Sequence, residues 1–582
     1  MDNFLFRREL YGSNSRRLRR ASQVCRRDLE ASMLKRLGST KTLEGHNGCV
    51  NTLRWNDDGT LLASGSDDRT VCIWDICGQK RTQHQTNHDG NIFGVEFVPY
   101  GEDRVVATCA GDHMIKLHDI EQNEELHSFN ADGRVKRLAT AQDEPYLFWS
   151  AGEDGFVREH DVRANDARII IRAPHGRYVK TMAVCQGRTE MVAVGLGVYY
   201  VPVYDRRMTS EGKAKVMLRC GPADCTTRSP RSQCLYSTHV AFDYPGRELI
   251  ANQSGGMAGG SVFVYNLTDS TDPTPTVQKL ARILDGSIEA PKKEEPIELD
   301  PQLIALKNEA KLLLDTPGKN FGKVIRLYTE CLSGNFQMSS EQRSILYGNR
   351  SITYLLNRQQ GDYYAALRDS IESLTLNPNY SKSYWRMMKA LVELRQFKLA
   401  EECVDLFKKR FPASPDLHTL EKVLNEANAK KEDNQDGYED LRSVTQPMQD
   451  YEARFTGHRN NQTDIKEANF FGSHNQYIIS GSDDGCLFIW DRSSGLIKAL
   501  FSADEDICNI AQPHPDKFLI ATSGIEHSIR FWEPLPEGEE ERRRRKVEDL
   551  VQTSPWEHFM YLQALIHART ADPEEEMESD ED

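Results

Sequence analysis

The chain has 582 residues, with 73 Lys and Arg against 88 Asp and Glu, so its formal net charge is −15. A chain of this length exceeds one ordinary hydrophobic core, and at least two compact units are expected. The acidic balance argues against direct binding of nucleic acid as the main activity. No run of 18 apolar residues and no apolar leader occurs, which predicts neither a membrane span nor a secretory signal. The 13 cysteines, an odd number, indicate reduced thiols in a protein of the nucleus and cytoplasm.

Residues 1–37 are predicted to form a basic arm of two helices, a helix-loop-helix around a break at Gly12–Asn14. Phe4, Leu5 and Leu10 would give the first helix an apolar face, and Leu18 begins the apolar positions of the second. A basic amphipathic helix suits binding in a groove of a partner protein. The alternative is a nuclear-localisation or nucleic-acid-binding tail built on the RRLRR run. We prefer partner binding, because the apolar face would have no use in an arm that binds by charge alone.

Two similar segments after the arm predict an all-β propeller. GHNGCVNTLRWNDDGTLLASGSDDRTVCIWD begins at Gly45, and a near copy from Gly457 to Asp491 contains YIISGSDDGCLFIWD. These are WD40 signatures, each typical of one blade. A buried hydrogen-bond chain is expected to keep the polar groups of each copy paired. Its members would be His46, Ser66, Asp68 and Trp74 in the first copy and His458, Ser482, Asp484 and Trp490 in the second.

Five weaker copies raise the expected number of blades to seven. They end at Asp119, Asp161, Asp205, Asn266 and Glu533. His118 and His160 stand where Trp would be in two of them. The stretch KTLEG before the first strong copy would supply the outer strand of the last blade and so remove exposed sheet edges. Blades 1–5 are expected over residues 40–266 and blades 6–7 over residues 451–536, with an inserted segment between blades five and six.

The inserted segment, residues 301–430, is predicted to be an all-α module of tetratricopeptide (TPR) repeats. Ala366 and Ala400 lie 34 residues apart, as do Pro378 and Pro412, which is the TPR period. A looser unit precedes these two, and three repeats suffice for a grooved stack. Residues 267–300 and 431–450 are expected to be linkers.

Residues 537–582 are expected to be a helix and an acidic tail. The run EEERRRRK is interpreted as a solvated helical stretch, and the apolar positions from Trp556 to Ile566 as a helix that packs on the last blade.

A WD40 propeller interrupted by TPRs resembles the adipose-like WD and tetratricopeptide repeat proteins over nearly the whole chain. The resemblance implies a substrate receptor of the cullin-four RING ubiquitin ligases, with influence on fat storage and chromatin-linked repression. The implied partners are cullin-four and the ligase adaptor, the large subunit of the damaged-DNA-binding protein; histones or corepressors are candidate substrates. No phosphate loop, nucleophile elbow or metalloprotease motif occurs, so we expect a non-catalytic subunit without cofactor.

Receptors of this class carry an Asp-x-Arg box at the end of the third strand in two adjacent blades. Here Asp161-Val162-Arg163 ends blade three and Asp205-Arg206-Arg207 ends blade four. An Arg in this position can present a rigid fork to the carboxylates or carbonyls of a partner. His160 departs from the Trp that the family prefers there. The boxes and the arm favour the ligase receptor over a chromatin- or chaperone-linked scaffold without a ligase role, which would use the same folds.

The TPR module could also hold a C-terminal carboxylate in its groove. On the frame of a two-carboxylate clamp, the donors would be Lys307, Lys311, Asn349, Lys382 and Arg386. Converging cations and an amide suit a terminal carboxylate, with chaperone C-termini or the chain's own acidic tail as candidate ligands. The alternative is that these residues are ordinary choices for a TPR surface.

Cys220, Cys225, Cys234 and His239 lie close together in the sequence. Their spacing matches no regular zinc pattern, so we expect no metal there.

Overall fold

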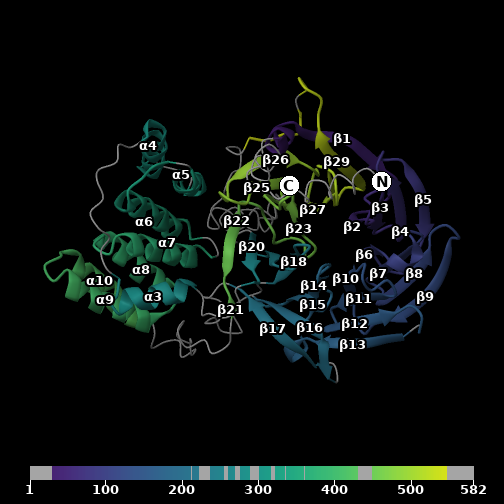
Figure 1. The fold of residues 1–582 in the computed structure, drawn as a ribbon, viewed down its shortest axis with the longest axis horizontal. Coiled ribbons are helices and arrows are strands. Elements are labelled where there is room, and N and C mark those ends of the chain that lie inside the picture. Colours follow the sequence, from purple (N-terminus) through teal and green to yellow (C-terminus); the bar gives the residue numbers. More distant parts are fainter. Residues whose placement is uncertain are drawn as a thin grey trace, which may run out of the picture. The chain divides into compact units, whose positions relative to one another are not determined.

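The computed structural model describes residues 29–546, except 165, 199, 211–212, 222–235, 255–259, 269–274, 289–299, 316–320, 335, 359–360, 430–447 and 540. The described residues divide into two compact units. The first consists of residues 29–254, 260–275 and 448–546, and the second of residues 276–429. In Figure 1 the first unit contains the labelled strands and the second the labelled helices.

The strands of the first unit form seven sheets in the part of the chain that the structure describes. In four of these sheets, consecutive strands of the chain pair in order. The first contains β2 (Val50–Trp55), β3 (Leu61–Ser66), β4 (Thr70–Asp75) and β5 (Lys80–Gln85). The second contains β6 (Ile92–Phe97), β7 (Val105–Ala110), β8 (Met114–Asp119) and β9 (Glu124–Asn130). The third contains β10 (Val135–Thr140), β11 (Leu147–Gly152), β12 (Phe156–Asp161) and β13 (Asp166–Arg172). The sixth contains β23 (Ala468–Phe471), β24 (Tyr477–Ser480), β25 (Cys486–Asp491) and β26 (Ile497–Ser502).

The seventh sheet is completed by the beginning of the chain. Its strands are β27 (Cys508–Pro513), β28 (Ile520–Gly524), β29 (Ser528–Pro534) and β1 (Leu37–Glu44). β1 pairs antiparallel with β29 from Leu37, opposite Pro534, to Glu44, opposite Ser528. The pairing expected from KTLEG is therefore confirmed. Residues 29–35 are helical, and Leu34 and Leu37 are buried in the core. The prediction that the N-terminal arm extends to residue 37 was therefore wrong, because Leu37 is the first residue of β1.

The inserted segment interrupts the fifth sheet instead of lying between two complete sheets. This sheet contains β18 (Ser237–Phe242), β19 (Glu248–Gln253), β20 (Ser261–Asn266) and β22 (Tyr451–Thr456). β20 precedes the insertion and β22 follows it, and the two pair antiparallel. The position expected for the insertion, after a complete blade, was therefore wrong.

The fourth sheet also receives a strand from beyond the insertion. It contains β14 (Val179–Val184), β15 (Met191–Leu196), β16 (Val201–Ser210), β17 (Lys213–Cys220) and β21 (Met448–Gln449). β21 runs parallel to β17. The end of the segment expected as a linker, 431–450, is thus part of a sheet.

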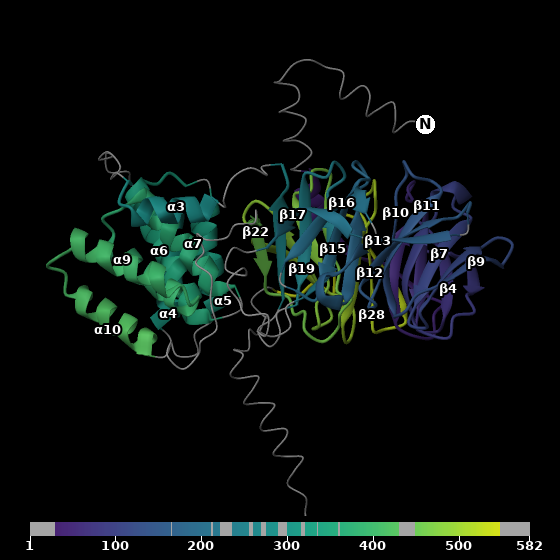
Figure 2. The same cartoon turned by 90° about the horizontal axis from the view of Figure 1, so that it is seen from below.

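The first strands of neighbouring sheets contact one another in a closed ring: β2, β6, β10, β14, β18, β23, β27 and back to β2. The sheets are arranged around this ring as in a β-propeller, and Figure 2 shows the unit edge-on, as a disc. Third strands such as β4 (TVCIWD) are wholly buried between neighbouring sheets, whereas the outer strand β5 (KRTQHQ) is mostly exposed. The core is therefore distributed between pairs of sheets.

The second unit is an array of helices. Its helices are α3 (Pro275–Leu284), α4 (Pro301–Asp315), α5 (Phe321–Ser333), α6 (Ser340–Asn357), α7 (Asp362–Leu376), α8 (Ser381–Glu393), α9 (Phe397–Arg410) and α10 (Asp416–Ala429). A capping box between Ser339 and Gln342 begins α6. From α4 onward each helix packs on the next along the chain.

Residues 541–546 are not helical, contrary to the expectation for the EEERRRRK run. Arg544 forms a bridge with Phe501, and the Arg545 N–H donates to the Leu500 carbonyl at 2.9 Å, so the run lies along β26. The Arg544 guanidinium lies 5.0 Å from the centroid of the Phe501 ring and donates to the Leu34 carbonyl. Residues 544 and 545 are not helical because their backbone pairs with β26 and extends its sheet. The apolar positions from Trp556 to Ile566 lie outside the described residues. None of the described helices is long and apolar enough to cross a membrane.

Closure of the seventh sheet by β1 predicts the effect of a core truncation. Leu37→Ala removes a side chain that is 0% exposed, and should lower the free energy of unfolding of the first unit by about 2–5 kcal/mol. Leu29→Ala is the control, because Leu29 is 53% exposed. Urea unfolding followed by tryptophan fluorescence measures both. Equal effects of the two changes would contradict the closure.

Candidate functional site: the two ends of the propeller

The first sheet contains a buried hydrogen-bond chain that joins its loop to its strands. His46 Nδ1 lies 3.0 Å from Asp68 Oδ2, and His46 Nε2 lies 2.7 Å from Ser64 Oγ. The Trp74 Nε1–H donates to the same hydroxyl at 2.9 Å. The prediction that Ser66 belongs to this chain of hydrogen bonds was wrong, because the Ser66 hydroxyl accepts the backbone N–H of Asp68. Ser66 is the last residue of β3, beyond the reach of Trp74, whereas Ser64 lies opposite Cys72 in the middle of the pair.

The second sheet repeats the chain with a histidine in the place of the tryptophan. His88 bridges Asp112 and Thr108 at 2.8 and 2.9 Å, and His118 Nε2 lies 3.0 Å from the same Thr108 hydroxyl. In the third sheet, His160 Nε2 lies 2.8 Å from Ser150 Oγ. The interpretation of both residues as substitutes for Trp is confirmed. Burial lowers the pKa of His118 and of His160 to about 3, so both rings are neutral.

The chain expected in the sixth sheet does not form. His458 Nε2 lies 3.0 Å from Asn252 Oδ1 of the fifth sheet, and the Trp490 Nε1–H donates to the Thr456 carbonyl. Ser482 accepts the backbone N–H of Arg459, and Asp484 accepts that of Cys486. The expected set His458, Ser482, Asp484 and Trp490 was therefore wrong.

Loop length explains the difference between the two sheets. His46 lies seven positions before Leu53, which pairs with Ser64. His458 lies ten positions before Ala468, which pairs with Ser480. The three additional residues carry His458 away from the serine of its own sheet. They also form a longer loop, residues 459–466, which we call the 459–466 loop.

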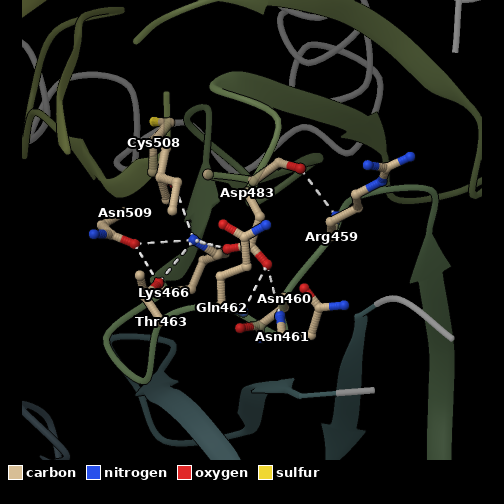
Figure 3. Close-up of polar contacts among 12 residues, drawn as sticks. Arg459, Asn460, Asn461, Gln462, Thr463, Lys466, Asp483, Cys508 and Asn509 are labelled. Atoms are coloured by element: carbon tan, nitrogen blue, oxygen red, sulfur yellow. Dashed lines mark hydrogen bonds and ion pairs between the residues drawn. The ribbon is translucent and has the colours of Figure 1, made fainter. Parts of the chain in front are cut away.

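A fully buried ion pair holds the 459–466 loop in place (Figure 3). Lys466 Nζ lies 2.8 Å from Asp483 Oδ1 and donates to Asn509 Oδ1 at 2.9 Å. Asp483 Oδ2 accepts the backbone N–H groups of Asn461 and Gln462 at 2.7 and 3.0 Å (Figure 3). Burial lowers the pKa of Lys466, and the Asp483 carboxylate opposes that shift. Because both charges are paired and hydrogen-bonded, the loop has a defined conformation.

The loop projects into a cavity at the upper end of the propeller, which we define as the end where second strands turn into third strands. The cavity has a volume of about 470 Å³. Its lining includes Asn51, Asp67, Phe93, Lys180, Tyr236 and Asp464. On one side, Lys136 and Lys180 alternate with Glu153 and Asp464 in a square of ion pairs between 2.9 and 3.9 Å. Lys136 Nζ also lies 3.9 Å from the centroid of the Phe93 ring.

A second group of charges, the Glu467 cluster, lies buried inside the ring of first strands. Glu467 Oε1 lies 2.6 Å from Arg137 Nη1, 3.7 Å from Arg54 Nη1 and 3.8 Å from His239 Nε2. Gln512 donates to the other carboxylate oxygen at 2.5 Å. Burial alone would raise the pKa of Glu467, but the two guanidinium groups lower it to about 2.

At the opposite, lower end, the third strands β12 and β16 of two adjacent sheets carry the same Asp–Arg fork, with Asp161 opposite Leu147 and Asp205 opposite Met191. Arg163 Nε and Nη2 donate to the two carboxylate oxygens of Asp161 at 2.9 and 2.7 Å. Arg207 makes the same two bonds to Asp205 at 3.0 and 2.9 Å. The Arg163 and Arg207 side chains are 60% and 65% exposed. The hydrogen bond from Arg163 lowers the pKa of Asp161 to about 2.

Aromatic side chains extend the surface beside the first fork. The Arg163 guanidinium lies 4.8 Å from the centroid of the Tyr146 ring. Tyr146 is 42% exposed and stacks on Tyr100, with ring centroids 5.9 Å apart. Tyrosine and arginine are the residue types that most often dominate protein–protein interfaces.

The other expected site residues are not brought together by the described structure. Phe4, Leu5, Leu10 and Leu18 lie outside the described residues. In the helical unit, Lys311 and Lys382 are exposed, and Lys307 and Asn349 are half-buried. Arg386 is only 7% exposed, and its guanidinium lies 5.6 Å from the Tyr380 ring centroid. The clamp stays a prediction, and a buried Arg386 is a poor member of it.

Among the cysteines discussed for zinc, Cys225 and Cys234 lie outside the described residues. Cys220 is buried in β17, and His239 Nδ1 lies 2.9 Å from the Ala468 carbonyl. The described part of the chain holds no group of three His, Cys, Asp or Glu residues that could bind a metal.

Comparison with known proteins identifies the family. Residues 38–75 and 449–491 match the WD domain, G-beta repeat family. The WD and tetratricopeptide repeats protein 1 of Mus musculus is 32% identical over 605 residues, which cover 89% of this chain and 87% of that protein. The chain belongs to the WD and tetratricopeptide repeats protein 1 family.

Two further relatives are similar to this chain, one at lower sequence identity and one over a smaller part of the chain. The Protein ALTERED SEED GERMINATION 2 of Arabidopsis thaliana is 25% identical, and 88% of each chain is covered. The DDB1- and CUL4-associated factor 6 of Mus musculus is 31% identical over 261 residues, 41% of this chain and 28% of that protein.

The Glu467 cluster and the Lys466–Asp483 ion pair were not predicted from the sequence. The adjacent charges Lys466 and Glu467 at the start of an apolar strand are the signal that could have indicated them. Charged residues there require buried partners, but the partners come from loops and sheets far away in the chain.

The Glu467 cluster predicts a large loss of stability when its carboxylate is removed. Glu467→Ala leaves the buried Arg137 guanidinium without its counter-ion, whereas Arg54 keeps Glu96 at 2.5 Å, and the loss should cost about 3–5 kcal/mol. Glu121→Ala, at an exposed position, is the control and should change little. Chemical unfolding measures both variants, and a Glu467→Ala effect no larger than the control would contradict the role assigned to the cluster.

The neutral buried histidines predict a pH dependence of stability. The pKa of His160 is lowered to about 3 in the folded protein, whereas an unfolded histidine titrates near 6.5. The unfolded state therefore binds more protons, so this contribution is complete above pH 6.5 and is lost as pH falls toward 3. His160→Phe, which retains a ring against Phe148, should make the slope of unfolding free energy shallower by about 1.4 kcal/mol per pH unit in that window.

Urea unfolding at pH 4.5, 5.5, 6.5 and 7.5 measures this slope. His474→Phe is the control, because His474 is exposed in the folded state. An unchanged slope in His160→Phe would show that His160 is protonated in the fold.

Proposed function

We propose that this chain is the substrate-receiving, non-catalytic subunit of a cullin-RING ubiquitin ligase. The lower end of the propeller would bind the adaptor, the damaged-DNA-binding protein's large subunit in complex with cullin-four. Other surfaces would recruit target proteins, with histones or corepressors as candidates. A relative over 41% of the chain is named a DDB1- and CUL4-associated factor, which supports this assignment. The proposed place of action is the nucleus and cytoplasm.

The observation that carries the proposal is the pair of matching forks. Arg163 and Arg207 each use Nε and Nη2 to bind the Asp two residues earlier, with distances that agree within 0.2 Å. Each guanidinium is thereby fixed before a partner arrives, and Nη1 is left as a donor. Preorganised, exposed Arg forks cost little entropy on binding and suit carboxylate or carbonyl acceptors. Structural stability does not require such a pair, since exposed ion pairs contribute little.

The N-terminal arm would approach the same end of the propeller. Leu37 pairs with Pro534, the last residue of a third strand. Asp161 is likewise the last residue of the third strand β12, and Asp205 has the matching register position in β16, so residues 29–36 enter the disc at its lower end. An arm with an apolar face that begins there could bind the adaptor together with the forks.

The finer architecture also belongs to this proposal. The seven sheets would be the seven blades of a WD40 propeller, and α4–α9 would be three TPR helix pairs. Ala366 in α7 and Ala400 in α9 are both 0% exposed, as small residues at a repeated packing position should be. The proposed domain ranges follow the sequence with four changes: the propeller begins at Leu37, its fifth sheet is interrupted, α3 lies within the expected linker 267–300, and β21 lies within the expected linker 431–450.

Substitution of the forks tests the proposal. Arg163→Ala combined with Arg207→Ala should weaken adaptor binding at least tenfold, because the fixed donors of the interface are lost. The melting temperature should stay unchanged, because both side chains are exposed. Titration of the full-length chain with purified adaptor gives the affinity. Arg134→Ala, which removes a 55% exposed, ion-paired Arg at the upper end, is the matched control.

Truncation of residues 1–28 tests the arm separately, since it leaves the buried Leu34 and Leu37 in place. The shortened chain should remain folded and lose most of its affinity for the adaptor. Full affinity in both the fork variant and the truncated chain would contradict the ligase role and favour a scaffold linked to chromatin or chaperones.

A further inference from the structure

The upper cavity holds one carboxylate that the protein's own cations do not neutralise. Asp67 lines the cavity and is half-buried. Its Oδ1 accepts a hydrogen bond from Asn51 Nδ2 at 2.6 Å. Within the described residues, Asp67 has no ion pair with Lys, Arg or His. A half-buried carboxylate with only neutral donors gains most from a cation that enters the cavity.

The lysines of the cavity are already neutralised. Lys180 lies 3.1 Å from Glu153 and 2.9 Å from Asp464, and Lys136 lies within 3.9 Å of the same two carboxylates. Both lysines contact Oδ2 of Asp464, so its Oδ1 has no cationic partner in the described part of the chain. An anion would have to compete with these carboxylates, whereas a cation finds acceptors on Asp67 and Asp464.

The walls of the cavity suit the apolar stem of a long cationic side chain. Phe93 and Tyr236 contribute aromatic rings, and Ile465 and Ile525 contribute aliphatic groups. Lys136, with its ammonium 3.9 Å from the Phe93 ring centroid, shows that a cation is stable against this wall. The volume of about 470 Å³ accommodates one such side chain with part of its backbone.

The cavity is also built in advance of any ligand. Its wall at Gln462–Ile465 belongs to the 459–466 loop, which the buried Lys466–Asp483 pair holds (Figure 3). A rigid wall does not have to be ordered when a ligand binds, which favours affinity.

We propose that the upper cavity is a recognition site for a lysine or arginine side chain of a basic peptide segment in a partner protein, with Asp67 as its counter-ion. This site goes beyond the proposed ligase role, because its ligand would bind at the end opposite to the Asp–Arg forks and would need no adaptor. Basic segments of target proteins would be held there while the lower end remains available.

The direct test uses fluorescein-labelled nine-residue peptides of Gly, Ser and Ala that differ only in the central residue: Arg, Lys, Leu or Glu. Fluorescence polarisation with the full chain should show binding of the Arg and Lys peptides at least about tenfold tighter than of the Leu and Glu peptides. Asp67→Asn, which keeps the size of the side chain and one acceptor oxygen for Asn51 but removes the charge, should remove that preference. Asp58→Asn, an exposed position of the same sheet at the lower end, should leave it intact.

A second measurement reports the place of binding. Cys49 lines the cavity and is half-buried, whereas Cys77 is exposed in the turn after β4 at the lower end. Excess Arg peptide should slow alkylation of Cys49 by iodoacetamide several-fold, as followed by mass spectrometry, and should leave Cys77 unaffected. Absence of binding, no preference for a central cation, tighter binding of the Glu peptide, or unchanged Cys49 reactivity would each overturn the proposal. None of these outcomes depends on adaptor binding, so failure here is distinguishable from failure of the ligase role.

Discussion

The first unit depends on the pairing of one buried carboxylate. Glu467 is completely buried and lies inside the ring of first strands, where an isolated charge would be strongly destabilising. Its partners Arg54, Arg137, His239 and Gln512 come from the first, third, fifth and seventh sheets. They converge only when the ring closes, so the cluster links correct closure to the neutralisation of charge. A partly assembled ring would leave several charges buried without partners, and this penalty favours the complete ring over alternative pairings of similar strands.

The two ends of this ring differ in structure. At the lower end the same Asp–Arg fork recurs in adjacent sheets because Asp161 and Asp205 have equivalent register positions, each opposite the first residue of the second strand. The upper end is not the same in every sheet, because the 459–466 loop is longer than the corresponding loop of the first sheet. Three additional residues move His458 from its own sheet to Asn252, and Lys466 becomes the anchor that fixes the loop beside the cavity. The disc thus has a repeated fork at its lower end and a single cavity at its upper end.

The sequence was sufficient for features that repeat at short range. The strand pattern was predictable because it depends on neighbouring residues, and His118 could be recognised because it occupies the place of a tryptophan in its repeat. The closing strand pairs Leu37 with the distant Pro534, and it was predictable because closure removes the exposed edge of the last sheet. Features set by distant parts of the chain were not predictable. Ser64 and Ser66 both fit the spacing of the hydrogen-bond chain, and only the position of Ser66 at the end of its strand excludes it. The Glu467 cluster was not predicted for the same reason, since Arg54, Arg137 and His239 are each more than two hundred positions from Glu467 in the chain. The clamp residues and the forks were located from the family pattern alone, and the described structure supports the geometry of the forks.

The most direct test of the ligase assignment is an experimentally determined structure of the full chain bound to the adaptor. We expect the adaptor to cover the lower end, with Nη1 of Arg163 and of Arg207 within hydrogen-bonding distance of its carboxylates or carbonyls, and with the upper cavity open to solvent. An adaptor that bound at the upper end or on the helical unit, with both Arg side chains still exposed, would contradict the account.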